Sequence, residues 1–171
     1  EVQKAAIQSI GPNSGNKTIL HLAKLFPAYE KEVTEAFVKA GNKSIAAIKE
    51  LLFHQKLSQK QKGKLILTCG RIGDRASQQF LLELFHPFQA ESYTIIKALN
   101  RSGFHVDEKN SNLVDAVTHA HLQRAVEILF MLNRSRSTHE IKVFMYDSLQ
   151  LELFDIRETL LNLFSFYSDK E

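Results

Sequence analysis

Apolar residues recur at helical spacing over most of the chain, and short polar turns separate the apolar runs. Pairs of large apolar residues stand four positions apart, as residues on the inward face of a helix do. These pairs are Leu22 and Phe26, Ile48 and Leu52, and Phe80 and Leu84. The same spacing predicts a helix over 1–10 and longer helices over 113–132 and 141–167. The pattern therefore predicts an all-α fold.

A glycine followed by a polar residue precedes each of these pairs, so that a unit of sequence repeats along the chain. The glycine suits the left-handed residue that ends one helix, and Asn or Asp directly after it can cap the next helix. The expected turns are Gly15-Asn16, Gly41-Asn42 and Gly73-Asp74, followed by Gly103 with Asp107 as its cap. Each repeat is thus predicted to be a helical hairpin, and the chain a right-handed stack of about five hairpins.

The stretch Leu67-Thr68-Cys69-Gly70-Arg71-Ile72-Gly73-Asp74 resembles the HEAT-like (armadillo-type) helical repeats, in which a helix ends with Gly-x-Ile-Gly-Asp. Ile72, Gly73 and Asp74 match that signature, whereas Ser77 stands where the family favours alanine and Cys69 where it favours leucine. The clear repeats cover residues 1–103, and longer, divergent helices follow over 111–168. The resemblance implies an α-α superhelix (a HEAT-like repeat solenoid) in a single 1–171 domain.

The resemblance also implies a non-catalytic scaffold that mediates protein–protein interaction, with a protein or the rest of its own chain as partner. Scaffolds of this kind present a ridge of helices to the partner, commonly the second helix of each hairpin. The exposed candidates on those helices are Lys17, His21, Lys24, Lys43, Lys49, Arg75 and Gln79.

Residues 11–18, GPNSGNKT, come close to the phosphate-binding loop pattern G-x-x-x-x-G-K-[ST], but Asn16 stands in place of the second glycine. Lys17-Thr18 has a repeat counterpart in Lys43-Ser44, which lacks the upstream glycine. A working loop also follows a buried strand, whereas 1–10 is predicted as a helix. We therefore assign the string to the repeat and expect no nucleotide or other cofactor.

The titratable residues form no arrangement typical of catalysis or of metal binding. His119 and His121 stand two positions apart and so point about 200° apart on a helix, while Asp115 and His119 would still need a third ligand. The lone Cys69 lies in an apolar run and is predicted to be a reduced core residue. We expect no catalytic residue, no metal site and no enzyme activity.

The chain holds 22 lysines and arginines against 19 acidic residues, a formal charge of +3. These charges are mixed along the sequence, which is typical of a solvated surface rather than of a nucleic-acid-binding stripe. Lys60, Lys62 and Lys64 alternate and would spread around a helix. Binding of nucleic-acid backbone stays an alternative, and it predicts an affinity for duplex DNA that falls steeply as salt rises.

A weaker resemblance lies near the C-terminus, where RETLLNLF at 157–164 follows Tyr146-Asp147-Ser148-Leu149. This pattern is similar to the soluble HEAT-like tails of bacterial nucleotide carriers of the ADP/ATP translocase type. It implies a regulatory domain on the cytoplasmic face of a membrane nucleotide transporter, and it predicts hydrophobic spans upstream in the full gene. The chain itself has no run of about 18 apolar residues. Because it begins at Glu1 rather than Met, we expect a piece of a longer, cytoplasmic protein.

Overall fold

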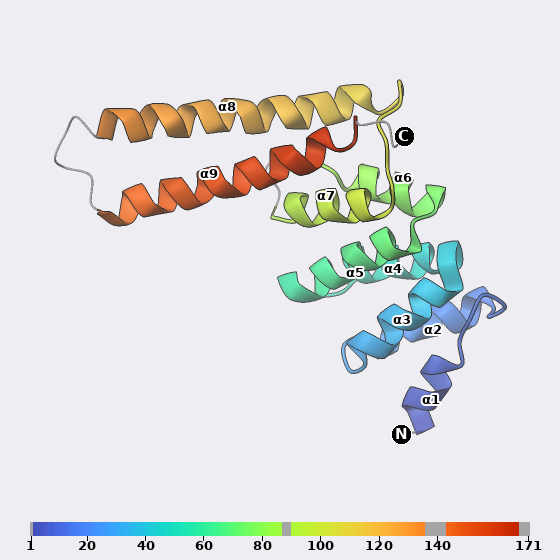
Figure 1. Ribbon diagram of the computed structural model, residues 1–171. Helices are drawn as coiled ribbons and strands as arrows, with labels where there is room; N and C mark the ends of the chain where they lie inside the picture. Colours follow the sequence, from blue (N-terminus) through green and yellow to red (C-terminus); the bar gives the residue numbers. More distant parts are fainter. Residues whose placement is uncertain (1, 87–89, 136–142, 168–171) are drawn as a thin grey trace. The chain divides into compact units, whose positions relative to one another are not determined.

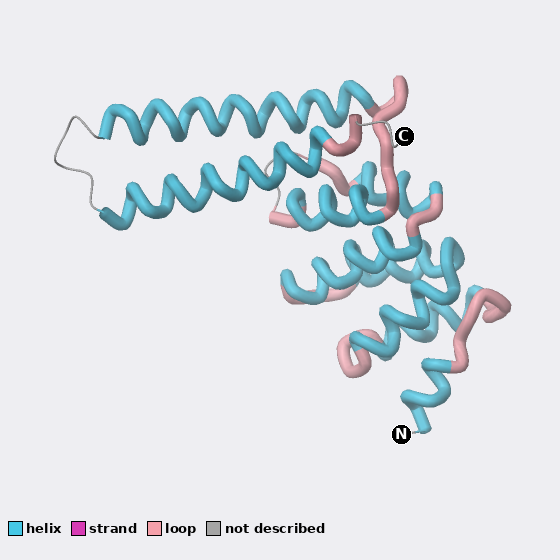
Figure 2. Tube along the Cα trace, in the orientation of Figure 1, coloured by secondary structure: helices cyan, strands magenta, loops and turns pink. Residues whose placement is uncertain are grey.

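A computed structural model of the protein describes residues 2–86, 90–135 and 143–167 (Figure 1). Within these residues every regular element is a helix, as Figure 2 also shows, which confirms the all-α prediction. In chain order the elements are α1 (Val2–Gln8), α2 (Asn16–Leu25), α3 (Glu30–Ala40), the 3₁₀ helix η1 (Gly41–Ser44), α4 (Ile45–His54), α5 (Gln59–Ile72), α6 (Arg75–Glu83), α7 (Ser92–Arg101), α8 (Ser111–Ser135) and α9 (Val143–Phe164).

Contacts divide the described chain into two compact units. The N-terminal unit holds residues 2–85 and 90–104, and therefore α1 to α7. The C-terminal unit holds His86 and the described residues from 105 onward, and therefore α8 and α9. The boundary lies next to Gly103, where the glycine repeats of the sequence end. The single 1–171 domain stays a prediction.

The helices of the N-terminal unit form two rows (Figure 1). The first row consists of α1, α3, α5 and α7, each in contact with the next, and the second row consists of α2, α4 and α6. Large side chains from both rows fill the space between them. The fully buried ones include Ile19, Phe26, Phe37, Ile48, Leu51, Leu65, Phe80, Leu81, Phe85, Ile95 and Ile96.

The inward positions predicted from helical spacing are mostly correct. Leu22, Phe26, Ile48 and Phe80 are buried. Leu52 and Leu84 are only half-buried, and their neighbours Leu51, Leu81 and Phe85 fill the core instead. At the C-terminal ends of α4 and α6 the buried position is therefore shifted by one residue from the prediction.

The turn at Gly73 and Asp74 forms as the repeat predicts. Gly73 ends α5 in the left-handed conformation, with φ 69° and ψ 6°. Asp74 then caps α6, because its Oδ1 accepts the Ser77 amide at 2.7 Å. Gly103 likewise has a positive φ of 70°, and the Asp107 carboxylate accepts the amide of Asn110 at 3.1 Å in the turn that leads to α8.

The prediction is wrong for parts of the two earlier turns. Gly15 has φ −71° and ψ 151°, an extended conformation that any residue adopts, and it is the N-cap position of α2. Asn16 therefore lies inside the first turn of α2, and its side chain makes no cap hydrogen bond. Gly41 does have a positive φ of 65°, but Asn42 belongs to η1 and does not cap α4. Ser44 takes the N-cap position of α4 but makes no side-chain cap hydrogen bond there; its hydroxyl donates instead to the Phe37 carbonyl of α3 at 2.6 Å.

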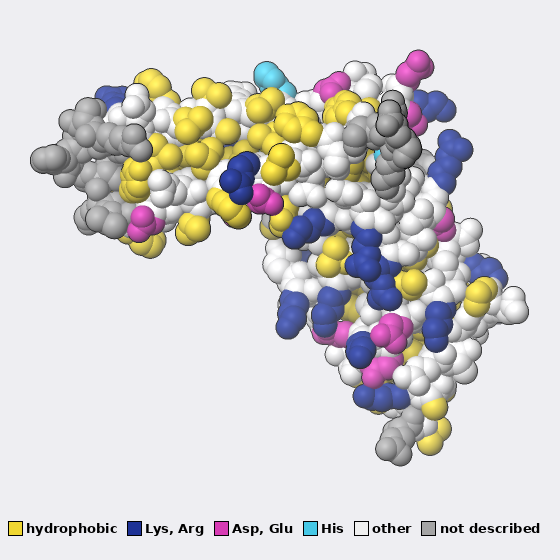
Figure 3. Space-filling model, in the orientation of Figure 1, with side chains coloured by type: hydrophobic (Ala, Val, Ile, Leu, Met, Phe, Trp, Pro, Cys, Tyr) yellow, Lys and Arg dark blue, Asp and Glu magenta, His cyan; other side chains and the backbone are white. Residues whose placement is uncertain are grey.

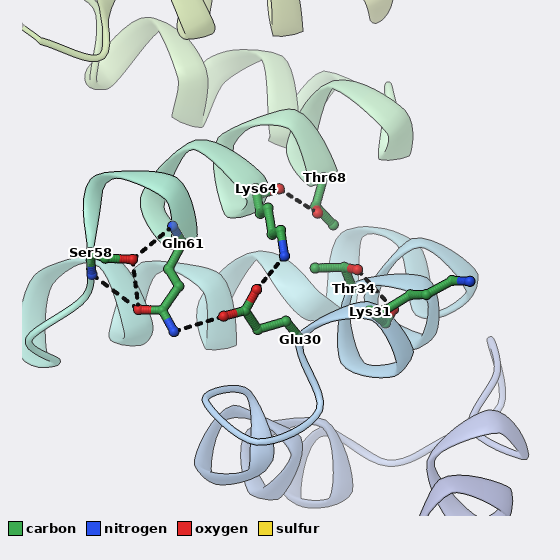
Figure 4. Close-up of polar contacts among 7 residues, drawn as sticks. All are labelled: Glu30, Lys31, Thr34, Ser58, Gln61, Lys64 and Thr68. Atoms are coloured by element: carbon green, nitrogen blue, oxygen red, sulfur yellow. Dashed lines mark hydrogen bonds and ion pairs between the residues drawn. The ribbon is translucent and has the colours of Figure 1, made fainter.

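A capping box starts α5 and joins it to α3 (Figure 4). The Ser58 hydroxyl accepts the Gln61 amide, and the Gln61 side-chain oxygen accepts the Ser58 amide at 3.0 Å. Gln61 Nε2 donates to Glu30 at 2.9 Å, and Lys64 forms an ion pair with the same carboxylate. These bonds lower the pKa of Glu30, Lys64 contributing most, and fix the register of the two neighbouring helices.

Helices α5 and α7 approach each other closely at Gly70. A Cβ atom at this position would lie 2.5 Å from the Ala98 carbonyl oxygen and 2.7 Å from the Ala98 Cα. Only glycine allows two backbones to come so near, so Gly70 sets the spacing of these two helices.

The C-terminal unit is an antiparallel pair of long helices, α8 and α9. One cluster of buried side chains between the two helices consists of Ile128, Leu132 and Ile156, with half-buried side chains around it, and Val114, Val117, Leu163 and Phe166 are buried as well. The ends are fixed by the Val106 amide, which donates to the Phe166 carbonyl at 3.0 Å, and by the Tyr167 hydroxyl, which donates to Asp115.

Candidate interaction surfaces

The second row carries the side chains that the sequence predicts for an interaction surface. Lys17, His21 and Lys24 come from α2, Lys43 from η1, Lys49 from α4, and Arg75 and Gln79 from α6. Because α4 is in contact with both α2 and α6, these groups lie on neighbouring elements. All of them are exposed except Lys49, which is half-buried.

Lys49 and Lys43 are engaged within the fold. Lys49 Nζ lies 2.8 Å from Glu83 Oε2 and 4.8 Å from the centre of the Phe80 ring, so it joins α4 to α6. Lys43 Nζ donates to the Pro12 carbonyl at 2.7 Å and so ties η1 to the loop between α1 and α2. The other members of the predicted set are therefore better placed to contact a partner.

The GPNSGNKT loop joins two helices rather than a strand and a helix. Helix α1 precedes it, as the sequence predicts. The Gly11 amide donates to Ser14 Oγ at 3.1 Å, and the Ser14 amide donates to the Gly11 carbonyl at 3.0 Å. These bonds use amides that a phosphate-binding loop would direct at its ligand. The loop therefore lacks the strand–loop–helix arrangement of a phosphate-binding loop.

The two histidines of α8 lie in different environments. His119 is exposed, whereas His121 is buried and its pKa is lowered by that burial. Asp115, four residues before His119, is engaged by Tyr167. Burial and the bond to Asp115 raise the pKa of Tyr167 to about 12. In the described part of the chain no three His, Cys, Asp or Glu side chains gather as metal ligands would.

Cys69 is a buried core residue with a free thiol, as predicted. Burial raises the pKa of its thiol to about 12, with a smaller contribution from Asp74. The thiol is therefore protonated at neutral pH and unsuited to nucleophilic chemistry.

Charge is distributed unevenly between the two parts of the chain. Residues 1–104 hold 15 lysines and arginines against 8 acidic residues, a formal +7, whereas residues 105–171 hold 7 against 11, a formal −4. On the face shown in Figure 3, basic side chains are spread over the N-terminal unit with acidic ones between them. The formal charge of the whole chain, +3, does not reveal this asymmetry because the positive and negative parts offset each other.

The alternating lysines of α5 spread around the helix as predicted. Lys62 Nζ lies 3.6 Å from Glu91 Oε1, ahead of α7, while Lys64 pairs with Glu30 on the opposite neighbour, α3. Lys60 stays exposed. Two of the three cations are thus engaged by neighbouring helices in the first row.

The C-terminal unit has an apolar surface that the sequence reasoning missed. Its exposed members on α8 and α9, hereafter the apolar face, are Leu122, Val126, Leu129, Phe130, Phe154, Leu161 and Phe164, with exposed fractions of 43–66%. Hydrophobic side chains are seen along the hairpin in Figure 3. Between the two helices, a groove of about 880 Å³ is lined by members of this face together with Tyr146, Gln150, Leu153, Arg157 and Leu160.

A signal for this face was present in the sequence. On α9, one line of residues follows the three-and-four spacing of a helix seam: Tyr146, Gln150, Leu153, Arg157, Leu160 and Phe164. On α8 the same spacing joins Leu122, Val126, Leu129 and Asn133. Helical spacing predicts the helices, whereas the covering of each apolar stripe depends on neighbours that the spacing does not identify.

The other side of the hairpin is polar. The Arg124 guanidinium donates to both oxygens of Glu152, at 2.7 and 3.1 Å, and to Glu127 at 3.3 Å. Hydrogen bonds to these two carboxylates raise the pKa of Arg124. The bonds join α8 to α9 on the side away from the apolar face, so the hairpin has one apolar and one charged side.

None of the described helices combines the length and the apolar content that crossing a bilayer requires. No family model matches the chain, and no curated protein or solved structure was found that matches it.

Proposed function

We propose that the N-terminal unit is a non-catalytic helical-repeat scaffold of the HEAT-like type, which binds an acidic segment of a protein partner. The observation that carries this proposal is the second row, where exposed basic side chains stand on α2 and α6 on either side of α4, whose Lys49 is engaged by Glu83. A row of stacked helices of this kind offers its groups along one line, to which an extended chain or a helix can bind.

Charge supports an acidic partner. The formal +7 of residues 1–104 creates a field that attracts anions and repels other basic surfaces. Within the second row, Lys17 and Lys24 lie on α2 and Arg75 lies on α6, all with exposed side chains. Exposed cations of this kind contribute mainly to the rate and specificity of association.

The α-α superhelix is part of the same proposal. Contacts between each first-row helix and the next, and between each second-row helix and the next, are what stacked helical hairpins produce. Such a stack has no single pocket, and its binding surface is the exposed side of a row.

Fluorescence anisotropy with a labelled poly-glutamate peptide of about 20 residues tests the proposal at low and at physiological salt. The triple variant Lys17→Glu, Lys24→Glu, Arg75→Glu is expected to weaken binding at least about tenfold, because it reverses the exposed charges of the second row. The matched control is Lys60→Glu, Lys97→Glu, Arg101→Glu, which makes the same change of charge on exposed residues of the first row. Equal loss in both variants, or no binding by the natural protein at low salt, would refute binding through the second row.

A second candidate is the binding of nucleic-acid backbone, which the same +7 charge favours. It predicts that the N-terminal unit's cations, including those of the first row, bind duplex DNA with an affinity that falls steeply with salt. A DNA duplex titrated into the protein at low salt tests this candidate, and undetectable binding would remove it.

A further inference from the structure

The α8–α9 hairpin buries too little of its own apolar surface. Its internal core is centred on Ile128, Leu132 and Ile156, while larger side chains such as Phe130 and Phe154 remain more than half exposed. A pair of helices has only one mutual interface, so side chains that lie off that interface need a further layer to cover them. The hairpin thus resembles half of a four-helix bundle, because it has apolar surface that a second pair of helices could cover.

The spacing of the residues along the groove and the apolar face favours helices as the partner. The line from Tyr146 to Phe164 on α9 alternates half-buried residues that pack on the hairpin's own core with exposed ones, and the line from Leu122 to Asn133 on α8 is exposed; both follow the alternation of three and four that a packed helix seam requires. Polar members interrupt each line: Gln150 and Arg157 on α9, and Asn133 on α8. Polar residues at such positions fix the register between paired helices.

The area of the apolar face matches a dimer interface. Its seven members are 43–66% exposed. At roughly 100 Å² for each half-exposed large side chain, they offer on the order of 700 Å² per copy. Two copies would bury about 1,400 Å² in total, within the range of stable protein interfaces, whereas a monomer seldom exposes so large an apolar patch.

We propose that the apolar face is a self-association surface, on which a second copy of this chain docks its own α8–α9 hairpin to form a four-helix bundle. The proposal concerns the C-terminal unit and does not depend on the function proposed for the N-terminal unit. Because the face is self-complementary, a two-fold axis pairs α8 with α8 and α9 with α9 of the second copy, each antiparallel. The polar side with Arg124 and Glu152 then faces water, so association stops at two copies.

Charge complementarity supports this arrangement. Arg157 lies on the groove, 4.6 Å from the Phe154 ring centre. Centring the antiparallel pair on Leu153 and Phe154 brings Arg157 level with Gln150 of the second copy and within one turn of its Asp147. The two arginines are thereby kept apart, and each lies near an acidic group.

An anionic lipid surface fits the same face less well. The described helices α8 and α9 carry Arg124, Arg134 and Arg157 against Asp115, Glu127, Asp147, Glu152, Asp155 and Glu158. An excess of acidic side chains repels anionic headgroups. Gln150 and Arg157 in the middle of the seam would also have to lose water to hydrocarbon.

Sedimentation equilibrium of the whole 171-residue chain, over concentrations from about 1 to 100 μM, tests the proposal. The expected result is a monomer–dimer equilibrium reaching twice the chain mass of 19.5 kDa. Leu161→Glu on the apolar face is expected to raise the dimer dissociation constant at least about 30-fold. The matched control is Leu151→Glu, since Leu151 lies on the same helix and is similarly exposed but does not line the groove.

A charge exchange tests the register. Arg157→Asp should weaken the dimer, and adding Asp147→Arg should restore it, because the pair is rebuilt with opposite signs. Circular dichroism of each variant checks that its helices are intact. A protein that stays monomeric at 100 μM, a dimer that Leu161→Glu leaves unchanged, or an equal effect of Leu151→Glu would overturn the proposal. Monomers that bind phosphatidylserine vesicles through this face would overturn it in favour of a membrane surface.

Discussion

Gly70→Ala is expected to destabilise the N-terminal unit, because α5 and α7 are in backbone contact at this position. The added Cβ would lie 2.5 Å from the Ala98 carbonyl oxygen, 2.7 Å from its Cα and 3.0 Å from its carbonyl carbon. All of these are backbone atoms of a helix, so no side-chain rotation relieves the overlap. The helices must move apart, and the packing of Leu65, Ile66 and Ile95 around them must loosen.

The size of the effect follows from two opposing terms. Overpacking a core by one carbon costs about 1–3 kcal/mol, and more where the backbone must shift. Alanine is better than glycine inside a helix by about 1 kcal/mol, which offsets part of this cost. Because the overlap here is with backbone, we expect a net loss of about 2 kcal/mol, which lowers the melting temperature of a 100-residue unit by about 10 °C.

Gly63→Ala on the same helix is the matched control. Its Cβ would meet only Thr94 Cγ2, at 3.9 Å, an ordinary contact. The gain in helix propensity therefore remains, and we expect a stabilisation of about 0.5–1 kcal/mol.

Urea unfolding followed by circular dichroism at 222 nm measures both changes as shifts of the midpoint at constant slope. The two substitutions in α5 are expected to change the free energy of unfolding with opposite signs. If Gly70→Ala were as stable as the natural protein while Gly63→Ala was stabilised, the close approach of α5 and α7 would be refuted.

Further predictions concern the turns, the thiol and the buried histidine. Gly41→Val should destabilise the unit by about 1–3 kcal/mol, because φ 65° with ψ −141° is costly for a β-branched residue; a thermal melt unchanged by the substitution would contradict this. Asp74→Ala should cost about 1 kcal/mol through loss of the α6 cap, whereas Asn42→Ala, which removes no cap bond, should change urea stability by less than about 0.5 kcal/mol; equal effects would count against the described caps. Cys69 should react with a thiol reagent at pH 8 at least about 100-fold more slowly in the native protein than in urea, and similar rates would show that the thiol is accessible. Burial lowers the pKa of His121, so the folded state binds fewer protons and stability should fall as pH drops below about 6.5; His121→Leu should flatten this fall in urea unfolding at pH 7 and pH 5, and an unchanged slope would refute the assignment.

Local signals predicted most of the helices and one complete turn. The helical spacing of apolar residues predicted α1, α8 and α9, because a helix buried on one side must repeat its apolar positions every three or four residues. Gly73 and Asp74 were also correct, since both requirements, a left-handed residue and a side-chain cap, are met by the residues themselves. Such features depend on a few neighbouring residues and can therefore be predicted from the sequence.

Features that depend on distant neighbours were missed. Gly15 looks like Gly73 in sequence, but the loop from Gly11 leads into α2 in an extended conformation, so no left-handed residue is needed there. Leu51 is buried instead of Leu52 because the packing of α4 against both rows, and not its own periodicity, sets its rotation. Gly70 gave no hint of the contact with Ala98, which arises from residues 28 positions apart.

The apolar face of the α8–α9 hairpin was missed for a related reason, and it explains why the two units differ. In the N-terminal unit, α3 and α5 each have neighbours on both sides within the first row as well as partners in the second row, so apolar residues around much of each helix become buried. Helices α8 and α9 are each other's chief neighbours, and a helix with one neighbour can bury only one stripe. Their remaining stripe keeps the spacing of a packed seam, with polar residues at positions where such residues fix the register of paired helices. A seam whose own hairpin cannot cover it is completed most simply by the same hairpin from a second molecule.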